Sequence, residues 1–209
     1  MSLAAELWEA NADLAEAART SAFVRGVADG GLPLPVFRHY VTQDAYFLEA
    51  FARAYALALA HSTGRAALET FASLLAGVLD ELRLHASYAE RWGTDPSATE
   101  PADATLAYTD FLLATAALGD VGLTCAAMTP CMRLYAFLGQ ALAEAGGHED
   151  SPYAEWVTTY ADPAFEDLAV RLEALLDEAP DGPRLRAAYR RAMRLEVAFF
   201  AAAVHGGTT

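Results

Sequence analysis

Apolar residues recur every three or four positions along most of the chain, which is the spacing of one face of an α-helix. Prolines and glycines fall between these stretches, where helices should end. The segment 23–33, with three glycines and a proline, predicts a structured turn. We therefore predict one all-α domain over residues 1–209, a bundle of about seven or eight helices. The predicted helices cover residues 3–18, 35–61, 65–92, 104–118, 121–145, 152–160, 163–178 and 183–205.

Two carboxylates interrupt otherwise apolar helix faces. Asp44 lies at helical spacing among five aromatic residues, and Glu196 has a similar setting near the end of the chain. A carboxylate that faces a core is costly to desolvate unless it meets donors or is protonated. The pattern predicts a small polar site inside the bundle, and an equally weighted alternative is two core carboxylates satisfied by hydrogen bonds. The first stripe comprises Phe37, Tyr40, Phe47, Phe51 and Tyr55, and the second Leu185, Tyr189, Ala192, Phe199 and Phe200.

Composition narrows the class of partner. The 209 residues are 55% apolar and carry a formal net charge of −14, which argues against a nucleic-acid surface and against docking on anionic lipid. The first residues carry acids where a signal peptide would be cationic. Apolar runs such as residues 54–60 are too short to span a bilayer. We expect a soluble, cytoplasmic protein whose partners are small molecules.

Cys125 and Cys131 lie on one predicted helix. Six residues separate them by about 9 Å, which is too far for a disulfide, so each is judged alone. Pro130 should kink the helix immediately before Cys131. Tyr135 follows Cys131 by four residues and shares its face. The thiol is a candidate nucleophile that needs a nearby base, and an inward-facing carboxylate is the natural proton partner; a small buried apolar residue is the simpler interpretation.

The segment 23–44, FVRGVADGGLPLPVFRHYVTQD, resembles the signature of the TenA family, also called thiaminase II or aminopyrimidine aminohydrolase. The spacing from the glycine–proline turn to the pair Gln43-Asp44 carries most of this resemblance. Further blocks occur in the expected order, so the resemblance covers almost the whole chain. These blocks are Ala107-Tyr108-Thr109, Pro130-Cys131 with Tyr135, Trp156 with Tyr160, and Leu195-Glu196 with Phe199-Phe200.

The resemblance implies a haem-oxygenase-like helical fold and a homo-oligomer, usually a tetramer, with a dimer as the alternative. It implies hydrolysis of 4-amino-5-aminomethyl-2-methylpyrimidine to the hydroxymethyl pyrimidine and ammonia in thiamine salvage. Many members of the family also cleave thiamine itself. No metal or organic cofactor is implied.

The resemblance also implies roles for individual residues. Cys131 would be the nucleophile that adds to the pyrimidine ring, and Glu196 the general acid/base that protonates a ring nitrogen. Asp44 would accept hydrogen bonds from the exocyclic amino group. A partly buried glutamate can have the raised pKa that this chemistry needs. The aromatic residues implied to shape the pocket around the ring are Phe47, Tyr108, Tyr135 and Tyr160.

The chain departs from the family pattern at two places. Phe47 stands where many members have tyrosine, so stacking would survive but one hydroxyl is missing, and we expect a reduced rate rather than lost binding. Met132-Arg133 replaces a proline–tryptophan-like pair. This second change bears on the shape of the site beyond the ring, and therefore on the choice between an amine and a thiazole leaving group.

Other interpretations remain at this stage. Glu81 and His85, four residues apart on an inward stripe, could be a metal pair, but their spacing differs from the Glu-x-x-His of di-iron bundles, and a hydrogen-bonded Glu–His pair in the core is favoured. A di-iron or haem-binding protein of the same architecture is the first competing function. A non-catalytic pyrimidine carrier or regulator is the second, although such a protein could dispense with Cys131.

Overall fold

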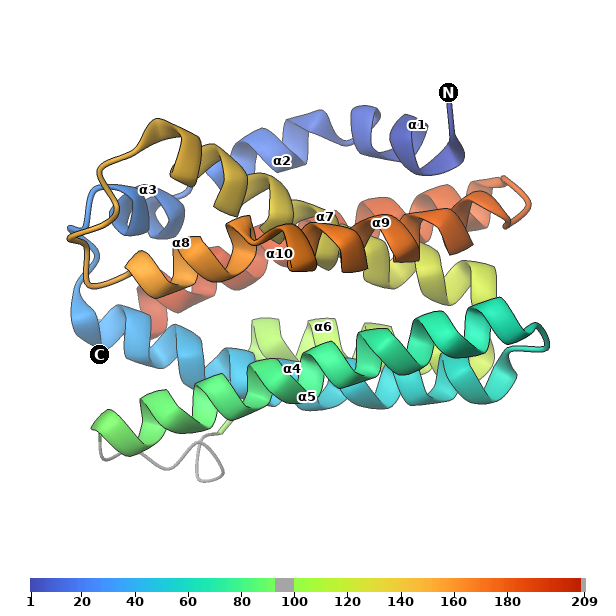
Figure 1. Ribbon diagram of the computed structural model, residues 1–209, viewed down its shortest axis with the longest axis horizontal. Helices are drawn as coiled ribbons and strands as arrows, with labels where there is room; N and C mark the ends of the chain where they lie inside the picture. The colour runs from blue at the N-terminus through green and yellow to red at the C-terminus, as the bar shows by residue number, and fades with distance from the viewer. Residues whose placement is uncertain (93–99, 208–209) are drawn as a thin grey trace.

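The computed structural model describes residues 1–92 and 100–207, which form ten helices and no strand (Figure 1). The predicted all-α class is therefore confirmed. The helices are α1 (Leu3–Glu9), α2 (Ala12–Arg19), α3 (Ala22–Ala28), α4 (Leu34–His61), α5 (Arg65–Trp92), α6 (Asp103–Leu118), α7 (Val121–Ala145), α8 (Ala154–Ala161), α9 (Pro163–Asp177) and α10 (Pro183–Gly206).

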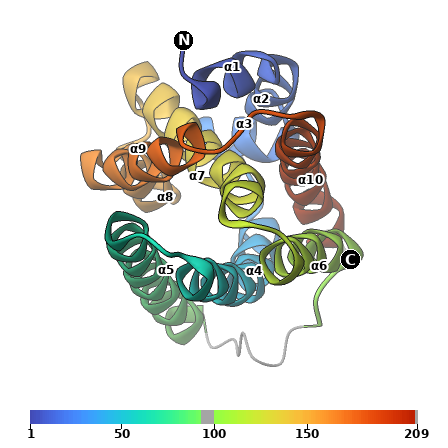
Figure 2. The same cartoon turned by 90° about the vertical axis from the view of Figure 1, so that its right-hand side faces the viewer.

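Helix α7 runs through the middle of the bundle (Figure 2). It packs against α4, α6, α8, α9 and α10, and α4 in turn packs between α5 and α6. Among the described helices, α7 alone is long and apolar enough to cross a membrane. However, 72% of its most apolar 18-residue stretch is buried inside the fold, as is typical of a core helix. Side chains on every face of α7 consequently meet other helices, and a polar group on it must find its partners inside the protein.

Two boundaries near the amino terminus differ from the prediction. The predicted helix 3–18 is divided into α1 and α2 because the backbone of Asn11 leaves helical geometry, and its side-chain amide donates to the Leu7 carbonyl oxygen at 2.7 Å. The segment predicted as a turn begins instead with α3, whose first turn is capped by the Ser21 hydroxyl. The turn itself is confined to residues 29–33, where Gly30 has a positive φ of 71°. Between the predicted helices 65–92 and 104–118, residues 93–99 lie outside the described residues.

Side-chain bridges hold the helices that carry the predicted site. The Gln43 amide of α4 accepts hydrogen bonds from the Thr105 hydroxyl at 2.6 Å and the Ala102 backbone N–H at 2.8 Å, and donates to the Glu100 carbonyl oxygen. The Arg133 guanidinium of α7 forms ion pairs with Glu166 and Glu173 of α9, at 2.8 and 2.6 Å. These partners fix Arg133 toward α9, where it lines a cavity between α1 and α9. Met132 lines a different cavity, between α5, α8 and α9.

Helices α7 and α8 approach each other closely at Gly139. A Cβ atom on this glycine would lie 2.4 Å from the backbone carbon of Tyr160, so no side chain fits there without a backbone shift. Gly77, in the interior of α5, differs because a Cβ atom there would meet only the flexible end of the Leu168 side chain.

We predict that Gly139→Ala lowers the free energy of unfolding by about 1–3 kcal/mol, because α8 must move away from α7. Gly77→Ala, the matched control, should be neutral or stabilising by up to about 1 kcal/mol, because alanine favours the helix. Urea unfolding of both variants tests the prediction. Equal effects of the two substitutions would contradict the close approach of α7 and α8.

Candidate active site

Three helices bring the predicted reactive groups into one buried region. Asp44 comes from α4, Cys131 from α7 and Glu196 from α10, with exposed fractions of 3%, 9% and 1%. The aromatic residues expected around them are buried as well, and they come from α4, α6, α7 and α8. These residues are Phe47, Tyr108, Tyr135 and Tyr160.

The Glu196 carboxyl faces the Cys131 thiol and hydrogen-bonds with it. Its Oε1 atom also accepts a hydrogen bond from the Tyr108 hydroxyl at 2.7 Å. Burial raises the pKa of Glu196 to about 7, although the hydrogen bonds from Tyr108 and Cys131 favour the ionised form. A carboxyl with this pKa can both give and take a proton near neutral pH.

Burial also raises the pKa of the Cys131 thiol well above its ordinary value, and the nearby carboxylates of Glu196, Asp44 and Glu81 raise it further. The resting group is therefore a thiol rather than a thiolate. Glu196 is the carboxyl that hydrogen-bonds with it, so attack by the sulfur requires transfer of its proton to Glu196. Cys125 is buried elsewhere on α7, and both cysteines are free thiols.

Asp44 is paired with His85, which the sequence pattern did not connect to it. The His85 Nε2 atom lies 2.8 Å from Asp44 Oδ2, and Nδ1 lies 2.9 Å from the Glu81 carbonyl oxygen. Burial alone would lower the pKa of His85, but the Asp44 carboxylate and, to a lesser extent, Glu81 raise it to about 9. His85 is therefore an imidazolium whose two N–H groups donate to these two oxygens.

The expected hydrogen-bonded pair of Glu81 and His85 is present, but it forms through the backbone carbonyl oxygen of Glu81 and not through its carboxyl. The Glu81 carboxyl instead accepts a hydrogen bond from the Tyr160 hydroxyl. Burial and the Asp44 charge raise the pKa of Glu81 to about 7, against the opposing effects of His85 and Tyr160. Spacing along α5 indicated that Glu81 and His85 face inward, but only the packing of α5 against other helices selects their partners.

Aromatic side chains form the remaining wall of the site. The Tyr135 ring lies 4.7 Å from that of Tyr160, and its hydroxyl lies 3.1 Å from the hydroxyl of Tyr40. The Tyr40 hydroxyl also accepts a hydrogen bond from the Trp156 indole N–H at 3.2 Å. Tyr40 and Trp156 therefore orient Tyr135, and neither was among the predicted site residues. Their aromatic character and inward positions were the signals that could have identified them.

Phe47 packs on the side of the site where Tyr108 and Glu196 lie. Its ring lies 4.8 Å from that of Tyr108, which holds Glu196, and 5.8 Å from that of Phe199. Phe47 thus places an apolar ring at this side of the site, and its stacking on a substrate ring stays a prediction. Because phenylalanine has no hydroxyl, Phe47 offers no hydrogen-bond donor next to Tyr108.

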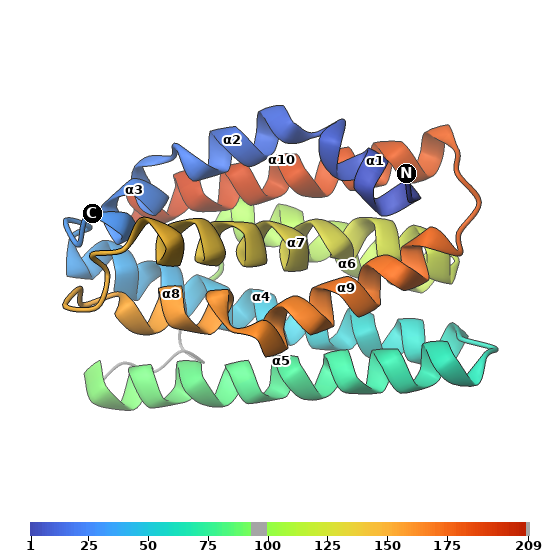
Figure 3. The ribbon, with the colours of Figure 1, turned by 45° about the horizontal axis from the view of Figure 1, so that its top comes forward.

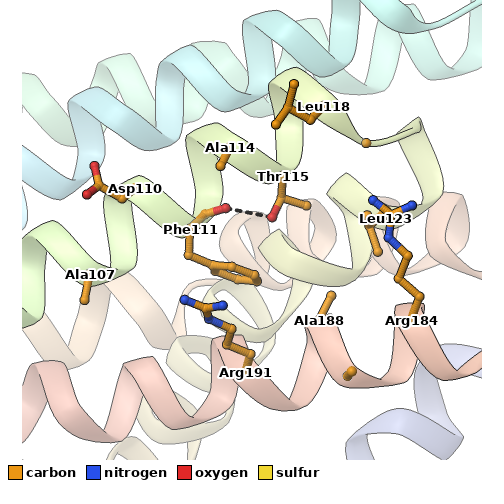
Figure 4. A pocket seen from close by; sticks show the side chains of 12 residues that line it. Ala107, Asp110, Phe111, Ala114, Thr115, Leu118, Leu123, Arg184, Ala188 and Arg191 are labelled. Carbon is orange, nitrogen blue, oxygen red and sulfur yellow. Dashed lines mark hydrogen bonds between the residues drawn. The ribbon is translucent and has the colours of Figure 1, made fainter.

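Two cavities differ in their relation to these residues. One, of about 610 Å³, lies between α6 and α10, and none of the predicted site residues lines it (Figure 4). The Arg191 guanidinium covers the Phe111 ring there at 4.8 Å. The other, of about 540 Å³, lies between α5, α8 and α9 and is lined by Glu81 and by Met132, the neighbour of Cys131.

The acids of this site do not assemble into a metal-binding group. Within residues 1–92 and 100–207, no three or more His, Cys, Asp or Glu side chains converge in a way that could hold a metal ion. His85, the one buried histidine of the region, has both ring nitrogens engaged by oxygens of the protein.

Known proteins resemble this chain in sequence and in fold. A model of the TENA/THI-4/PQQC family matches residues 15–206. The chain belongs to this family. It is 37% identical over 187 residues to an aminopyrimidine aminohydrolase of Halalkalibacterium halodurans, with 87% of this chain and 84% of that protein aligned.

A second relative is much longer than this chain. The chain is 36% identical over 208 residues to the mitochondrial bifunctional TH2 protein of Arabidopsis thaliana. The aligned region covers 86% of this chain but only 34% of that protein. The chain thus spans about a third of the length of that relative.

Solved structures confirm the fold. A protein described as a TenA family transcription regulator, from Silicibacter sp. TM1040, superposes with a TM-score of 0.90 at 29% identity, covering 97% of each chain. A Shewanella denitrificans domain with a heme oxygenase-like fold has a TM-score of 0.74 at 13% identity, covering 98% of this chain and 91% of that one. The predicted haem-oxygenase-like bundle is therefore confirmed.

We predict that His85 stays protonated until about pH 9, whereas burial without a neighbouring acid lowers the pKa of His39 below 6.5. Asp44→Asn should lower the pKa of His85, because it removes the carboxylate that stabilises the imidazolium. NMR titration of the histidine ring protons measures both values, with His85→Gln used for assignment. An unchanged pKa of His85 in Asp44→Asn would contradict the pairing.

Proposed function

We propose that this protein is an aminopyrimidine aminohydrolase of the thiaminase II type, which hydrolyses 4-amino-5-aminomethyl-2-methylpyrimidine to the hydroxymethyl pyrimidine and ammonia. The observation that carries the proposal is the buried Cys131 thiol hydrogen-bonded to Glu196, a carboxyl whose pKa is about 7. The name of the Halalkalibacterium relative, which aligns over most of both chains, supports the same reaction. Thiamine salvage is the corresponding role.

In this mechanism Glu196 moves one proton between the sulfur and the ring. It donates its proton to a ring nitrogen and takes the proton of Cys131 while the sulfur bonds to a ring carbon, so the adduct gains no net charge. The electrons of the disrupted ring then expel the substituent, an ammonium on the methylene carbon, as neutral ammonia. Water adds to the same carbon, where its oxygen becomes the hydroxyl, and its second proton is released to solvent. Return of the ring-nitrogen proton through Glu196 to the departing sulfur restores both groups.

Asp44 and the aromatic walls position the pyrimidine. His85 occupies Oδ2 of Asp44 and stabilises its negative charge, so that Oδ1 is the oxygen that we assign to the exocyclic amino group of the substrate. Tyr108, Tyr135 and Tyr160 surround the ring, and Phe47 stacks beside Tyr108. A carboxylate held by a charged histidine cannot move toward the solvent without breaking a buried ion pair.

Thiamine cleavage, the cytoplasmic location and a homotetramer or dimer stay predictions. Cleavage of thiamine would use the same attack on the pyrimidine ring, with the thiazole as the leaving group in place of ammonia.

We predict that Cys131→Ser lowers ammonia release from the aminomethyl pyrimidine at least about 1000-fold, because a serine hydroxyl is a far weaker nucleophile at this pH. Cys125→Ser is the matched control, since Cys125 lies on the same helix, is also buried and has no proposed role. It should keep the wild-type rate, with circular dichroism confirming the fold of both variants. Activity retained by Cys131→Ser would remove the thiol from the mechanism.

We predict that Phe47→Tyr raises kcat by about two- to tenfold and leaves KM nearly unchanged, because it adds one hydrogen-bond donor next to Tyr108. Phe111→Tyr, on α6 at the other cavity, is the control for a hydroxyl added to an aromatic side chain. Steady-state kinetics with the aminomethyl pyrimidine gives both constants. A lower kcat in Phe47→Tyr would show that the missing hydroxyl of Phe47 does not reduce the rate.

A further inference from the structure

Glu81 contacts the site but has no part in the roles assigned above. Its carboxyl accepts a hydrogen bond from Tyr160, one of the aromatic residues around the proposed pyrimidine position. Its backbone carbonyl oxygen fixes His85, which pairs with Asp44. The residue is therefore held from both ends, and its carboxyl has a defined direction.

The carboxyl of Glu81 also lies on the wall of the cavity between α5, α8 and α9. Helix α5 runs along the same side of the bundle as α8 and α9 (Figure 3). The cavity has a volume of about 540 Å³ and a mostly apolar wall that includes Leu74, Met132 and Phe165. Because Glu81 lines the cavity and its carboxyl hydrogen-bonds with Tyr160, the cavity adjoins the position proposed for the pyrimidine ring.

The charge of this cavity favours cations. Besides Glu81, the described residues that line it include Asp80, Glu155 and Asp162, and none of them is Lys, Arg or His. Glu81 hydrogen-bonds with Tyr160, a residue of the proposed pyrimidine site. Asp80 is instead paired with Arg83, and Asp162 caps the first turn of α9.

We propose that this cavity receives the leaving group of the substrate and that the Glu81 carboxylate binds the positive charge of that group. The inference rests on the proposed function and assigns the class of substituent: an alkylammonium, or a cationic aromatic ring such as a thiazolium. A cavity of this volume is far larger than ammonia requires and holds a ring against its apolar wall. The carboxylate is not consumed, because the C–N bond breaks with its electron pair on the nitrogen and ammonia leaves neutral.

The ionisation of Glu81 gives this proposal a signature in pH. Burial and the charge of Asp44 raise the pKa of Glu81 to about 7, so the carboxyl is neutral in mild acid and anionic above neutrality. Binding of an ammonium should therefore strengthen as pH rises through 7, whereas binding of a neutral alcohol should gain nothing from this ionisation. The titratable and charged groups that face Glu81 are Tyr40, Asp44 and Tyr55 of α4, Asp80 and His85 of α5, Cys131 and Tyr135 of α7, Glu155 and Tyr160 of α8, and Asp162 at the start of α9.

The test compares two ligands that differ only in the leaving group, the aminomethyl and the hydroxymethyl pyrimidine. Calorimetric titration in a Cys131→Ser background, where turnover is blocked, gives the ratio of the two affinities between pH 6 and 8. With Glu81 present, the preference for the amine should increase about tenfold over this range, because the ionised fraction of a group with a pKa near 7 increases by that factor. Glu81→Gln should abolish the increase and leave the affinity for the alcohol within about twofold.

Two further variants separate this role from a structural one. Glu69→Gln, the same substitution at an exposed position of α5, should keep the full pH dependence. Tyr160→Phe removes the hydrogen bond that favours the ionised carboxyl, so the midpoint of the increase should move to higher pH. A merely structural residue would not move this midpoint.

The outcomes also distinguish this inference from the proposed function. If Glu81→Gln binds both pyrimidines as before and keeps the pH-dependent preference, the role of Glu81 is overturned and the hydrolase proposal stands. The same holds if Tyr160→Phe leaves the midpoint in place. If the protein with Glu81 intact binds neither pyrimidine, the proposed function fails and the inference fails with it.

Discussion

Three carboxylates face one buried thiol, and one histidine is the cation that balances them. Glu81, Asp44 and Glu196 all act on the pKa of Cys131, whereas His85 is the positive partner, paired with Asp44 at 2.8 Å. Asp44 and Glu196 are buried and Glu81 is half-buried, so three negative charges here would repel one another and be poorly solvated. Asp44 obtains its counterion from His85, and the other two carboxyls respond with pKa values of about 7. Their capacity to exchange protons near neutrality follows from this shortage of positive charge.

The arrangement depends on α7 being surrounded by other helices. Cys131 can be buried only because α4, α8 and α10 cover its side of α7, and those same helices supply Asp44, Tyr160 and Glu196. The polar bridges lie around the site rather than in it. Gln43 holds α4 to residues 100–105, and Arg133 holds α7 to α9. These bridges limit relative movement of the helices, and the catalytic groups need such fixed distances.

The proposed reaction divides the acids by position. Glu196 lies with Tyr108 beside the thiol, where a proton must pass between sulfur and ring. Glu81 lies with Tyr160 at the wall of the cavity, where a departing group would be received. Asp44 lies with His85, where an amino group would be recognised. A similar pKa for Glu81 and Glu196 therefore does not imply a similar role, because each carboxyl faces a different part of the proposed substrate.

The sequence by itself determined which side chains face inward. Helical spacing was enough to predict the all-α class and the bounds of α5 and α7, and it indicated that Asp44 and Glu196 face inward, because a regular helix repeats its inner face every three or four residues. Spacing failed where the backbone departs from regularity, at Asn11, and where a capped helix of seven residues was too short to show a period, in α3. Only the tertiary structure decided the pairing of His85 with Asp44 and of Glu81 with Tyr160. Partners 41 and 79 residues apart are selected by how whole helices pack, and no local pattern along one helix contains that information.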